Sequence, residues 1–250
     1  MTVVFDPDSG RLHLDEPGFD ALFAIAAGRH PEPQADDELR QAGVIGDTTI
    51  HDAVAPGLLA MANPVAQAQL SMINETGRWW GSRIWVGSEA AAFLMSTGDE
   101  LDELIINAPR FFSASIARVV GLGPRLNQTF EPWLMDTDRI AQLLSTDITQ
   151  RQSAARAVQP SDDSTEEFVA SIVEGPWHYW TLHVTWTPAP GADEGRPLRI
   201  VDSTQSMAIL SPSDSQISID PLTPTEAWLL LTMILPDDDE IAATSDGAEG

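Results

Sequence analysis

GPWHYWTLHVTWT, residues 175–187, places three tryptophans, one tyrosine and two histidines within thirteen positions. Successive side chains of a β-strand point to opposite faces of the sheet. In a strand over this stretch, His178 and His183 are five residues apart and therefore lie on opposite faces, so they do not bind one metal ion together. The alternation gives an apolar face of His178, Trp180, Leu182, Val184 and Trp186, and a more polar face of Trp177, Tyr179, Thr181, His183, Thr185 and Thr187.

This pattern predicts an amphipathic strand of the hydrophobic core. We expect His178, at the head of the apolar face, to be a strand-end residue with a local hydrogen bond. On the other face, Trp177, Tyr179 and His183 are suited to contact with a helix or a protein partner.

Further strands are predicted on both sides of a central helical region. Runs rich in β-branched and aromatic residues, separated by Gly, Ser and Asp, favour strands with short turns. Short turns without crossover helices favour antiparallel pairing. The expected strands are 67–75, 78–89, 90–96, 103–109, 177–187, 198–203, 206–211 and 216–220.

Helices are expected before and after each group of strands. Apolar residues at helical spacing, with proline and glycine at the ends, predict helical segments within 15–62 and over 111–123, 138–158 and 161–172. Thr223, followed by Pro224 and Glu226, has the signature of a capped helix start.

The order helices, strands, helix thus occurs twice. It predicts an α+β fold, a quasi-two-fold arrangement of antiparallel β-sheet with flanking helices, built from two similar meander-plus-helix halves. We expect one domain over 1–235, with halves of roughly 15–125 and 136–235. Residues 236–250 contain six acids, no base and no apolar periodicity, so a disordered acidic tail is expected there.

The charge excludes some classes of partner. The 250 residues include 38 acidic and 13 basic ones, all arginine, for a formal net charge of −25. A nucleic-acid partner is not expected, because such proteins need clustered cations to displace counterions from phosphates. Anionic membrane surfaces are disfavoured for the same reason. The longest apolar run, at 228–235, is too short to span a bilayer, and the N-terminus has no signal-peptide pattern. We therefore expect a cytoplasmic location without membrane insertion.

No motif of catalysis or cofactor binding is found. The chain has no cysteine, no HExxH, no GxSxG and no phosphate-binding loop. The sequence therefore predicts no catalytic residues, no metal and no cofactor. Trp79 and Trp85 share one strand face, and Trp80 shares the other with Ile84 and Val86. These tryptophans suit either cross-strand core packing or an exposed docking surface.

Three segments resemble a known family in their order. LRQAGVIGDTTIHDAVAPGLLAMANP at 39–64 has a Gly-Val pair, a turn, a helix and a closing Ala-Asn-Pro. FFSASIARVVGLGPRL at 111–126 is similar to the end of that family's first half, and a long middle helix then leads to a second strand set. In this order, across roughly 19–235, the chain resembles the EspG-like chaperones of type VII (ESX) secretion in actinobacteria.

The resemblance implies a fold and a function. It implies a quasi-two-fold central antiparallel sheet with helices on one side. It also implies a non-enzymatic chaperone or adaptor that binds a PE–PPE heterodimer and keeps it soluble before export. Family members use sheet and loop surfaces for this task, often with a long loop between early strands. The matching connections here, 86–90 and 96–102, are short, and Gln205-Ser206 replaces the family's Gly-Arg pair.

Two groups of residues are the candidates for partner binding. They are the connection Gly87, Ser88, Glu89 and Ala90, and the strand residues Trp177, Tyr179 and His183. Two other functions stay open. An enzyme with a dispersed His/carboxylate site requires a deep pocket that brings His178 or His183 within reach of a carboxylate. A structural subunit would form a homodimer through its aromatic strands.

Overall fold

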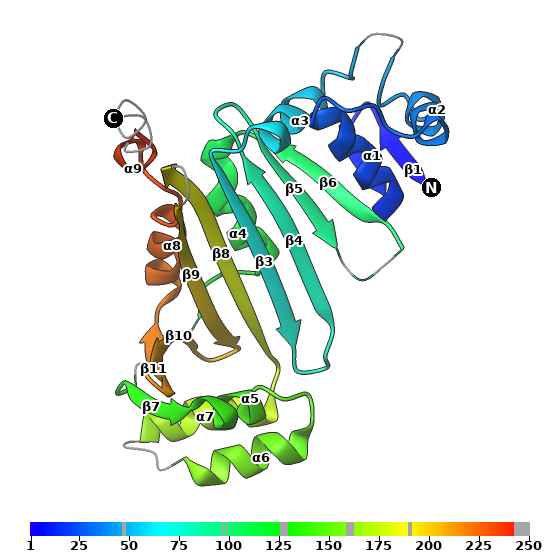
Figure 1. Ribbon diagram of the computed structural model, residues 1–250. Coiled ribbons are helices and arrows are strands. Elements are labelled where there is room, and N and C mark those ends of the chain that lie inside the picture. Colours follow the sequence, from blue (N-terminus) through cyan, green and yellow to red (C-terminus); the bar gives the residue numbers. More distant parts are fainter. Residues whose placement is uncertain are drawn as a thin grey trace.

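The computed structural model describes residues 1–46, 49–96, 98, 100–125, 130–158, 163–189 and 192–242. These residues contain one eleven-stranded sheet in the order β1-β2-β6-β5-β4-β3-β8-β9-β10-β11-β7, and every pair of neighbours is antiparallel (Figure 1). The predicted antiparallel α+β fold is confirmed. The strands are β1 Val3–Asp6, β2 Arg11–Leu14, β3 Ala66–Asn74, β4 Trp79–Val86, β5 Ala91–Ser96, β6 Asp102–Asn107, β7 Trp133–Asp136, β8 Trp177–Ala189, β9 Ala192–Ser203, β10 Met207–Ser213 and β11 Gln216–Leu222.

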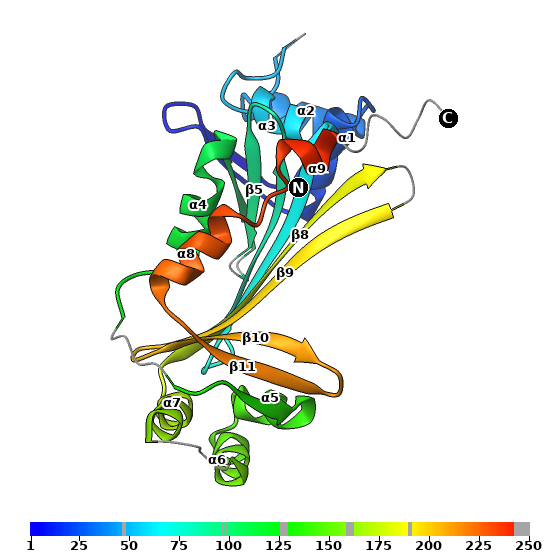
Figure 2. The ribbon, with the colours of Figure 1, turned by 90° about the vertical axis from the view of Figure 1, so that its left-hand side faces the viewer.

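The helices form three groups around this sheet. The first helical lobe, α1 to α3, and the second helical lobe, α5 to α7, lie at the two ends of one face (Figure 1). Helices α4 and α8 lie side by side on the other face (Figure 2). The helices are α1 Glu16–Ala26, α2 Pro33–Gln41, α3 Ala55–Ala62, α4 Phe112–Val119, α5 Thr137–Leu143, α6 Ile148–Ala157, α7 Asp163–Glu174, α8 Pro224–Thr232 and α9 Asp238–Ala242, with a 3-10 turn at Pro109–Phe111.

Strand β8, which contains the tryptophan-rich stretch, pairs with β3 along the middle of the sheet. The predicted alternation is confirmed. Trp180, Leu182 and Val184 are fully buried in the core beneath α4 and α8. Trp177, on the opposite face, is buried in the separate core of the second helical lobe. Burial of aromatic and β-branched side chains of this size contributes roughly 1.5–3 kcal/mol each, so the strand anchors two cores at once.

The expectation of helices on one side of the sheet is wrong, because both faces carry helices. Strands β4 and β5 explain why. Ile84 and Phe93 point into the core beneath α4, whereas Trp85 and Leu94, one residue later, are buried beneath the first helical lobe. A strand that is apolar on both faces needs cover on both.

The two halves of the chain repeat the same order of elements. The order β2, α1, α2, α3, β3, β4, β5, β6, α4 is followed by β7, α5, α6, α7, β8, β9, β10, β11, α8, and the strands are arranged about the β3–β8 pair. Leu70 of β3 pairs with Leu182 of β8 in the middle of that pairing. A quasi-two-fold axis through this rung, perpendicular to the sheet, relates the halves. The predicted quasi-two-fold arrangement is therefore present.

Strand β9 is longer than expected, since it begins at Ala192 instead of residue 198. Gly195 and Pro197 favour a turn in the sequence, yet both pair with β8. Strand β10 pairs only with residues 200–202 of β9. Pro197 therefore has a strand neighbour on one side alone, which is where a residue without an N–H group is tolerated.

The acidic tail differs from the expectation of disorder over its first residues, because Asp238–Ala242 form α9. The side chains and backbone N–H groups of Asp237 and Glu240 cap each other. Arg196 forms an ion pair with Glu240 and donates to the carbonyls of Met233 and Leu235. These contacts order a segment that has no apolar periodicity. Residues 243–250 lie outside the described residues.

Candidate functional site: the open face of the sheet

The two helical lobes leave the middle of their sheet face uncovered (Figures 1 and 2). The register shows which residues share this face, since Gln69 pairs with both Arg83 and His183, and His183 pairs with Pro197. We call this area the open face and define it by Gln67, Gln69, Ser71, Trp79, Gly81, Arg83, Thr181, His183, Thr185, Pro197 and Arg199.

The open face is polar, which explains why none of the described helices covers it. Gln67, Gln69 and His183 are exposed, whereas Ala68 and Leu70, which point to the other face, are buried. A shallow cavity of about 270 Å³ lies over this area, lined by Gln67, Ala68, Gln69, Arg83, Ile84, Trp85, His183 and Thr185. An uncovered polar sheet face between two helical walls is suited to receiving another protein.

Arg83 lies at the border of the open face and the first helical lobe. Its guanidinium carbon is 4.4 Å from the centre of the Phe19 ring and 6.0 Å from that of Trp85. In the part of the chain that the structure describes, no carboxylate lies within ion-pair distance of it. The rings hold a planar cation by its face and leave its N–H groups available.

Arg199 lies on β9, opposite Thr181 of β8. It also has no carboxylate partner among the described residues. Burial raises the pKa of the neighbouring Tyr179 hydroxyl, and the positive charge of Arg199 offsets part of this rise.

The quasi-two-fold axis relates these two arginines. Arg83 pairs with Gln69, which precedes Leu70, and Arg199 pairs with Thr181, which precedes Leu182. Because Leu70 and Leu182 pair on the axis, a half-turn about it exchanges Arg83 with Arg199.

Two glycines let side chains lie flat on the open face. The Trp79 indole occupies the space where a Cβ on Gly81 would be. A Cβ on Gly195 would lie 2.7 Å from Nε2 of His183. Trp79 remains 47% exposed, so it presents apolar surface beside the arginines. The predicted alternation of the tryptophans holds, since Trp79 and Trp85 share the face of Gln67 and Trp80 lies on the other face with Met72. Trp85 is core, whereas Trp79 is exposed.

The three predicted strand residues have different surroundings. His183 is exposed on the open face. Tyr179 is partly buried at its border, against the core of the second helical lobe. Trp177 is only 2% exposed and contacts that lobe instead of solvent. The predicted helix contact therefore applies to Trp177, and direct contact of any of the three with a partner stays a prediction.

The predicted connection Gly87 to Ala90 lies elsewhere. It joins β4 to β5 and packs against α3, where a Cβ on Gly87 would lie 3.0 Å from Ala60. A cavity of about 300 Å³ separates the turn from the exposed Leu59 of that helix. The connection and His183 thus belong to two different surfaces, and the role of the connection in binding stays a prediction.

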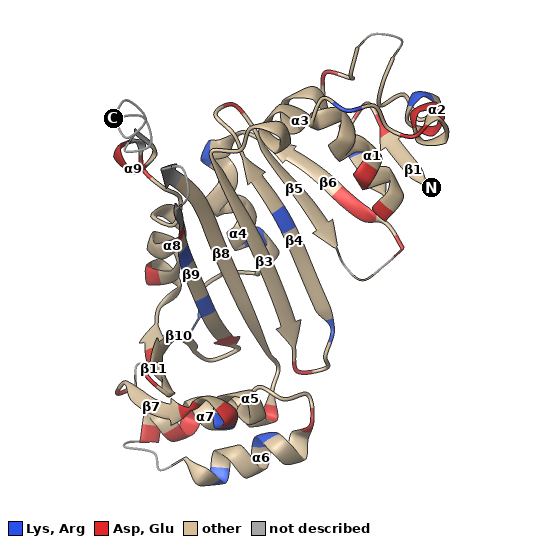
Figure 3. Ribbon diagram, in the orientation of Figure 1, with Lys and Arg blue, Asp and Glu red and all other residues tan. Residues whose placement is uncertain are grey.

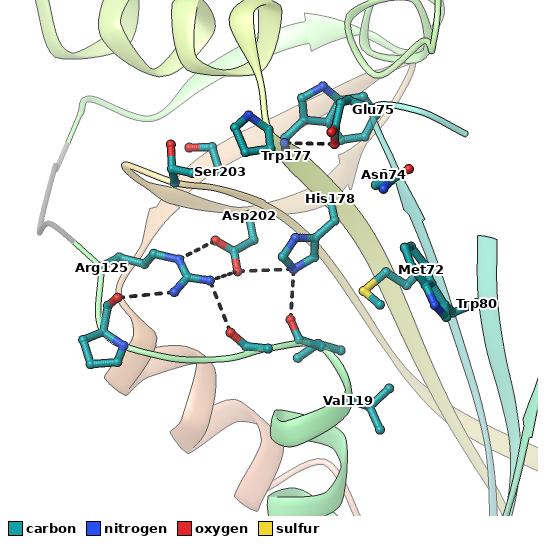
Figure 4. Close-up of a pocket in the computed structure, with 15 residues that line it drawn as sticks. Met72, Asn74, Glu75, Trp80, Val119, Arg125, Trp177, His178, Asp202 and Ser203 are labelled. Carbon is teal, nitrogen blue, oxygen red and sulfur yellow. Dashed lines mark hydrogen bonds and ion pairs between the residues drawn. The ribbon is translucent and has the colours of Figure 1, made fainter. Parts of the chain in front are cut away.

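A second polar cluster lies on the opposite face, in a cavity of about 530 Å³ near the start of β8 (Figure 4). Asp202 is 1% exposed, and Arg125 donates to both of its carboxylate oxygens, at 3.0 and 2.9 Å. His178 Nε2 lies 3.4 Å from Asp202 and 3.0 Å from the Val120 carbonyl. His178 thus has a hydrogen bond near the start of its strand, as predicted, but the partner is not local, since Val120 is 58 residues away in the sequence. The contact with Asp202 also brings a histidine within reach of a carboxylate, which is one of the two features required of an enzyme with a His/carboxylate site.

The polar groups of this cluster hydrogen-bond to one another, which is typical of a cluster that stabilises the structure. Arg125 also donates to the carbonyls of Gly121 and Pro124. The hydroxyl of Ser203, in the same cavity, bonds to Ser171 and to the Ser206 carbonyl instead of His178. Among the described residues, no three His, Asp or Glu side chains are grouped as metal ligands. The cluster joins the segment after α4 to β9 and so connects the two halves.

Arg83 and Arg199 were missed by the sequence analysis. Alternation within RIW at 83–85 places Arg83 on the face of Trp79 and Trp85, but only the strand register places Arg199 on that face. Pairing across β3 and β8 joins residues more than a hundred positions apart, and a local sequence pattern does not predict such a pairing.

Similarity to known structures is limited to the fold. No protein-family model matches the chain, and no curated protein matches it. The chain is similar to the solved structure of the Mycobacterium tuberculosis type VII secretion system chaperone EspG5 in complex with the PE25-PPE41 dimer. The match has 12% sequence identity and a TM-score of 0.59, and it covers 90% of this chain and 97% of that chain. At this identity, the similarity shows a shared EspG-like fold. No helix in the described part of the chain is long and apolar enough to cross a membrane.

Proposed function

We propose that this chain is a cytoplasmic chaperone or adaptor of type VII secretion that binds a PE–PPE-type dimer through the open face. The observation that carries the proposal is the uncovered polar face between two helical lobes, in a fold similar to a chaperone solved with such a dimer. A rigid eleven-stranded sheet gives a preformed surface, which lowers the entropic cost of binding.

The charge of the chain supports this role. A net charge of −25 keeps a protein dispersed at high concentration. A complex that inherits this charge would stay soluble when its client alone would aggregate. The groups around His178 bind one another, so we propose no catalytic role for them.

The test is co-expression with PE–PPE pairs encoded near the gene, followed by co-purification. We expect one pair to co-purify with the wild-type chain. Gln69→Trp adds bulk at an exposed position of the open face, and we expect it to abolish the complex without unfolding the chain. Ala114→Trp adds the same bulk at an exposed position of α4, on the other side of the sheet, and should leave the complex intact. Retention of a client by the Gln69→Trp variant would contradict docking on this face.

A further inference from the structure

Arg83 and Arg199 have no described carboxylate partner, in contrast to some other arginines of the chain. Five others form ion pairs, namely Arg11, Arg40, Arg125, Arg139 and Arg196 with Glu103, Asp36, Asp202, Asp136 and Glu240. Acids outnumber bases by about three to one in the chain, yet none is paired with either arginine among the described residues. None of the residues that define the open face is an acid.

The surroundings of the open face sharpen this contrast. In Figure 3, acidic residues gather on the helical lobes and the loops, while the middle of β3, β4, β8 and β9 is neutral or basic. A carboxylate that approaches the open face is repelled by the acidic lobes and loops around it and is attracted near the two arginines. Such an arrangement fixes the position of a partner by attraction at one place and repulsion elsewhere.

The spacing of the two arginines fits an elongated segment that lies over the sheet and passes between them, where the quasi-two-fold axis emerges. Three strand spacings across the sheet and two residues along it separate the two Cα atoms by roughly 16 Å. An α-helix with its side chains is about 10–12 Å wide. A helix between Arg83 and Arg199 would bring acidic side chains on its two flanks within reach of both guanidinium groups. The Phe19 ring already restrains Arg83, so less entropy is lost on pairing.

We propose that the client presents carboxylates on opposite sides of its docking segment, one to Arg83 and one to Arg199. This inference rests on the proposed function and names the chemistry of the client at the same face. A second copy of the chain fits less well, because two molecules of charge −25 repel each other. Two arginines are also too few to hold a nucleic acid against that charge.

The test compares variants against the PE–PPE pair that co-purifies with the wild-type chain, by titration at several salt concentrations. Arg83→Gln and Arg199→Gln should each weaken binding about tenfold, and Arg83→Glu and Arg199→Glu about a hundredfold. Arg118→Glu is the matched control, since Arg118 is exposed on α4 across the sheet, and its affinity should be unchanged. Binding by the wild type should weaken as salt rises, and binding by the glutamine variants should depend less on salt.

Restoration of binding to Arg83→Glu by a client in which one acidic residue is replaced by arginine would establish the pairing. Unchanged affinity of both glutamate variants, with binding still abolished by Gln69→Trp, would overturn this inference and leave the proposed function standing. Absence of any bound PE–PPE pair with the wild type would overturn both. A wild-type dimer that Arg83→Glu and Arg199→Glu convert to monomers would assign the arginines to self-association and overturn the acidic client. Near-identical thermal unfolding of all variants is the control for folding.

Discussion

Tyr179 is the only tyrosine of the chain, and its environment is set by two elements at once. Its ring lies against the core of the second helical lobe, and Arg199 is its charged neighbour. Because the anionic phenolate is disfavoured by burial, the pKa of Tyr179 lies above its ordinary value of 10.0. The folded chain therefore holds the phenol proton more tightly than the unfolded chain does.

The sign of this shift makes a pH prediction. The contribution of Tyr179 to stability is complete below the ordinary pKa and is lost as the pH rises through the raised value. We expect the tyrosinate absorbance of the native chain to appear at higher pH than that of the chain in denaturant. Arg199→Gln should move the native transition higher still, because it removes the favourable cation. If tyrosinate forms in the native chain at or below the pH at which it forms in the denatured chain, the burial of Tyr179 is contradicted. The Tyr179→Phe variant, which has no tyrosine, gives the background absorbance.

At the scale of the element, helix α8 begins as its sequence predicts. The Thr223 hydroxyl accepts from the Glu226 N–H, and the Glu226 carboxylate accepts from the Thr223 N–H. The hydrogen bonds that the carboxylate accepts, from the Thr223 N–H and the Thr223 hydroxyl, lower the pKa of Glu226. A capping box of this kind satisfies two backbone donors that have no partner within the helix.

Loss of the capping hydroxyl should destabilise the chain measurably. Thr223→Ala is expected to lower the free energy of unfolding by about 1 kcal/mol, within a range of roughly 0.5–2. Thr225→Ala, two residues later on the exposed side of the same helix, should change it by less than about 0.5 kcal/mol. Chemical denaturation of the two variants measures the difference. Equal losses would show that the cap contributes nothing beyond helix propensity.

Elements with local signals were predicted, and elements without them were not. The faces of β8 and the start of α8 follow from spacing and from one tetrapeptide. The first residues of β9 did not, because Gly195 and Pro197 favour a turn and pair with β8 only through tertiary structure. Helix α9 was missed for a related reason, since Arg196, more than forty residues earlier, anchors it.

At the scale of the whole molecule, the two halves are joined by the long β3–β8 seam. Strand β3 has 9 residues and β8 has 13, and each would become an unpaired edge if the halves were separated. Long, uncovered edges of this kind lead to aggregation. The site depends on the same seam, because Arg83 and Arg199 share a face only through it. That dependence is why the sequence predicted a protein-docking strand without its two arginines.

Separate expression of residues 1–125 and 130–242 tests this view of the seam. We expect each half alone to aggregate and the two halves produced together to form a complex that runs as the intact chain does. The intact chain should unfold in one calorimetric transition, with the calorimetric and van't Hoff enthalpies equal. A stable monomer from either half would show that the seam is not needed for folding. Separation would also break the Arg125–Asp202 ion pair, because each half contains only one of the two residues.

The axis through Leu70 and Leu182 has a consequence for the orientation of a bound client. A perfectly symmetrical face would accept a segment in either of two directions with equal affinity, and such ambiguity would leave the far end of the client pointing the wrong way half of the time. Trp79 removes this degeneracy, because its symmetry-related position on β9 is Gly195. A client bound as proposed would meet an indole on one flank and bare backbone beneath His183 on the other. In the proposed complex, the duplicated sheet would supply the anchor points, and the divergence of symmetry-related residues, Trp79 and Gly195 among them, would give them polarity.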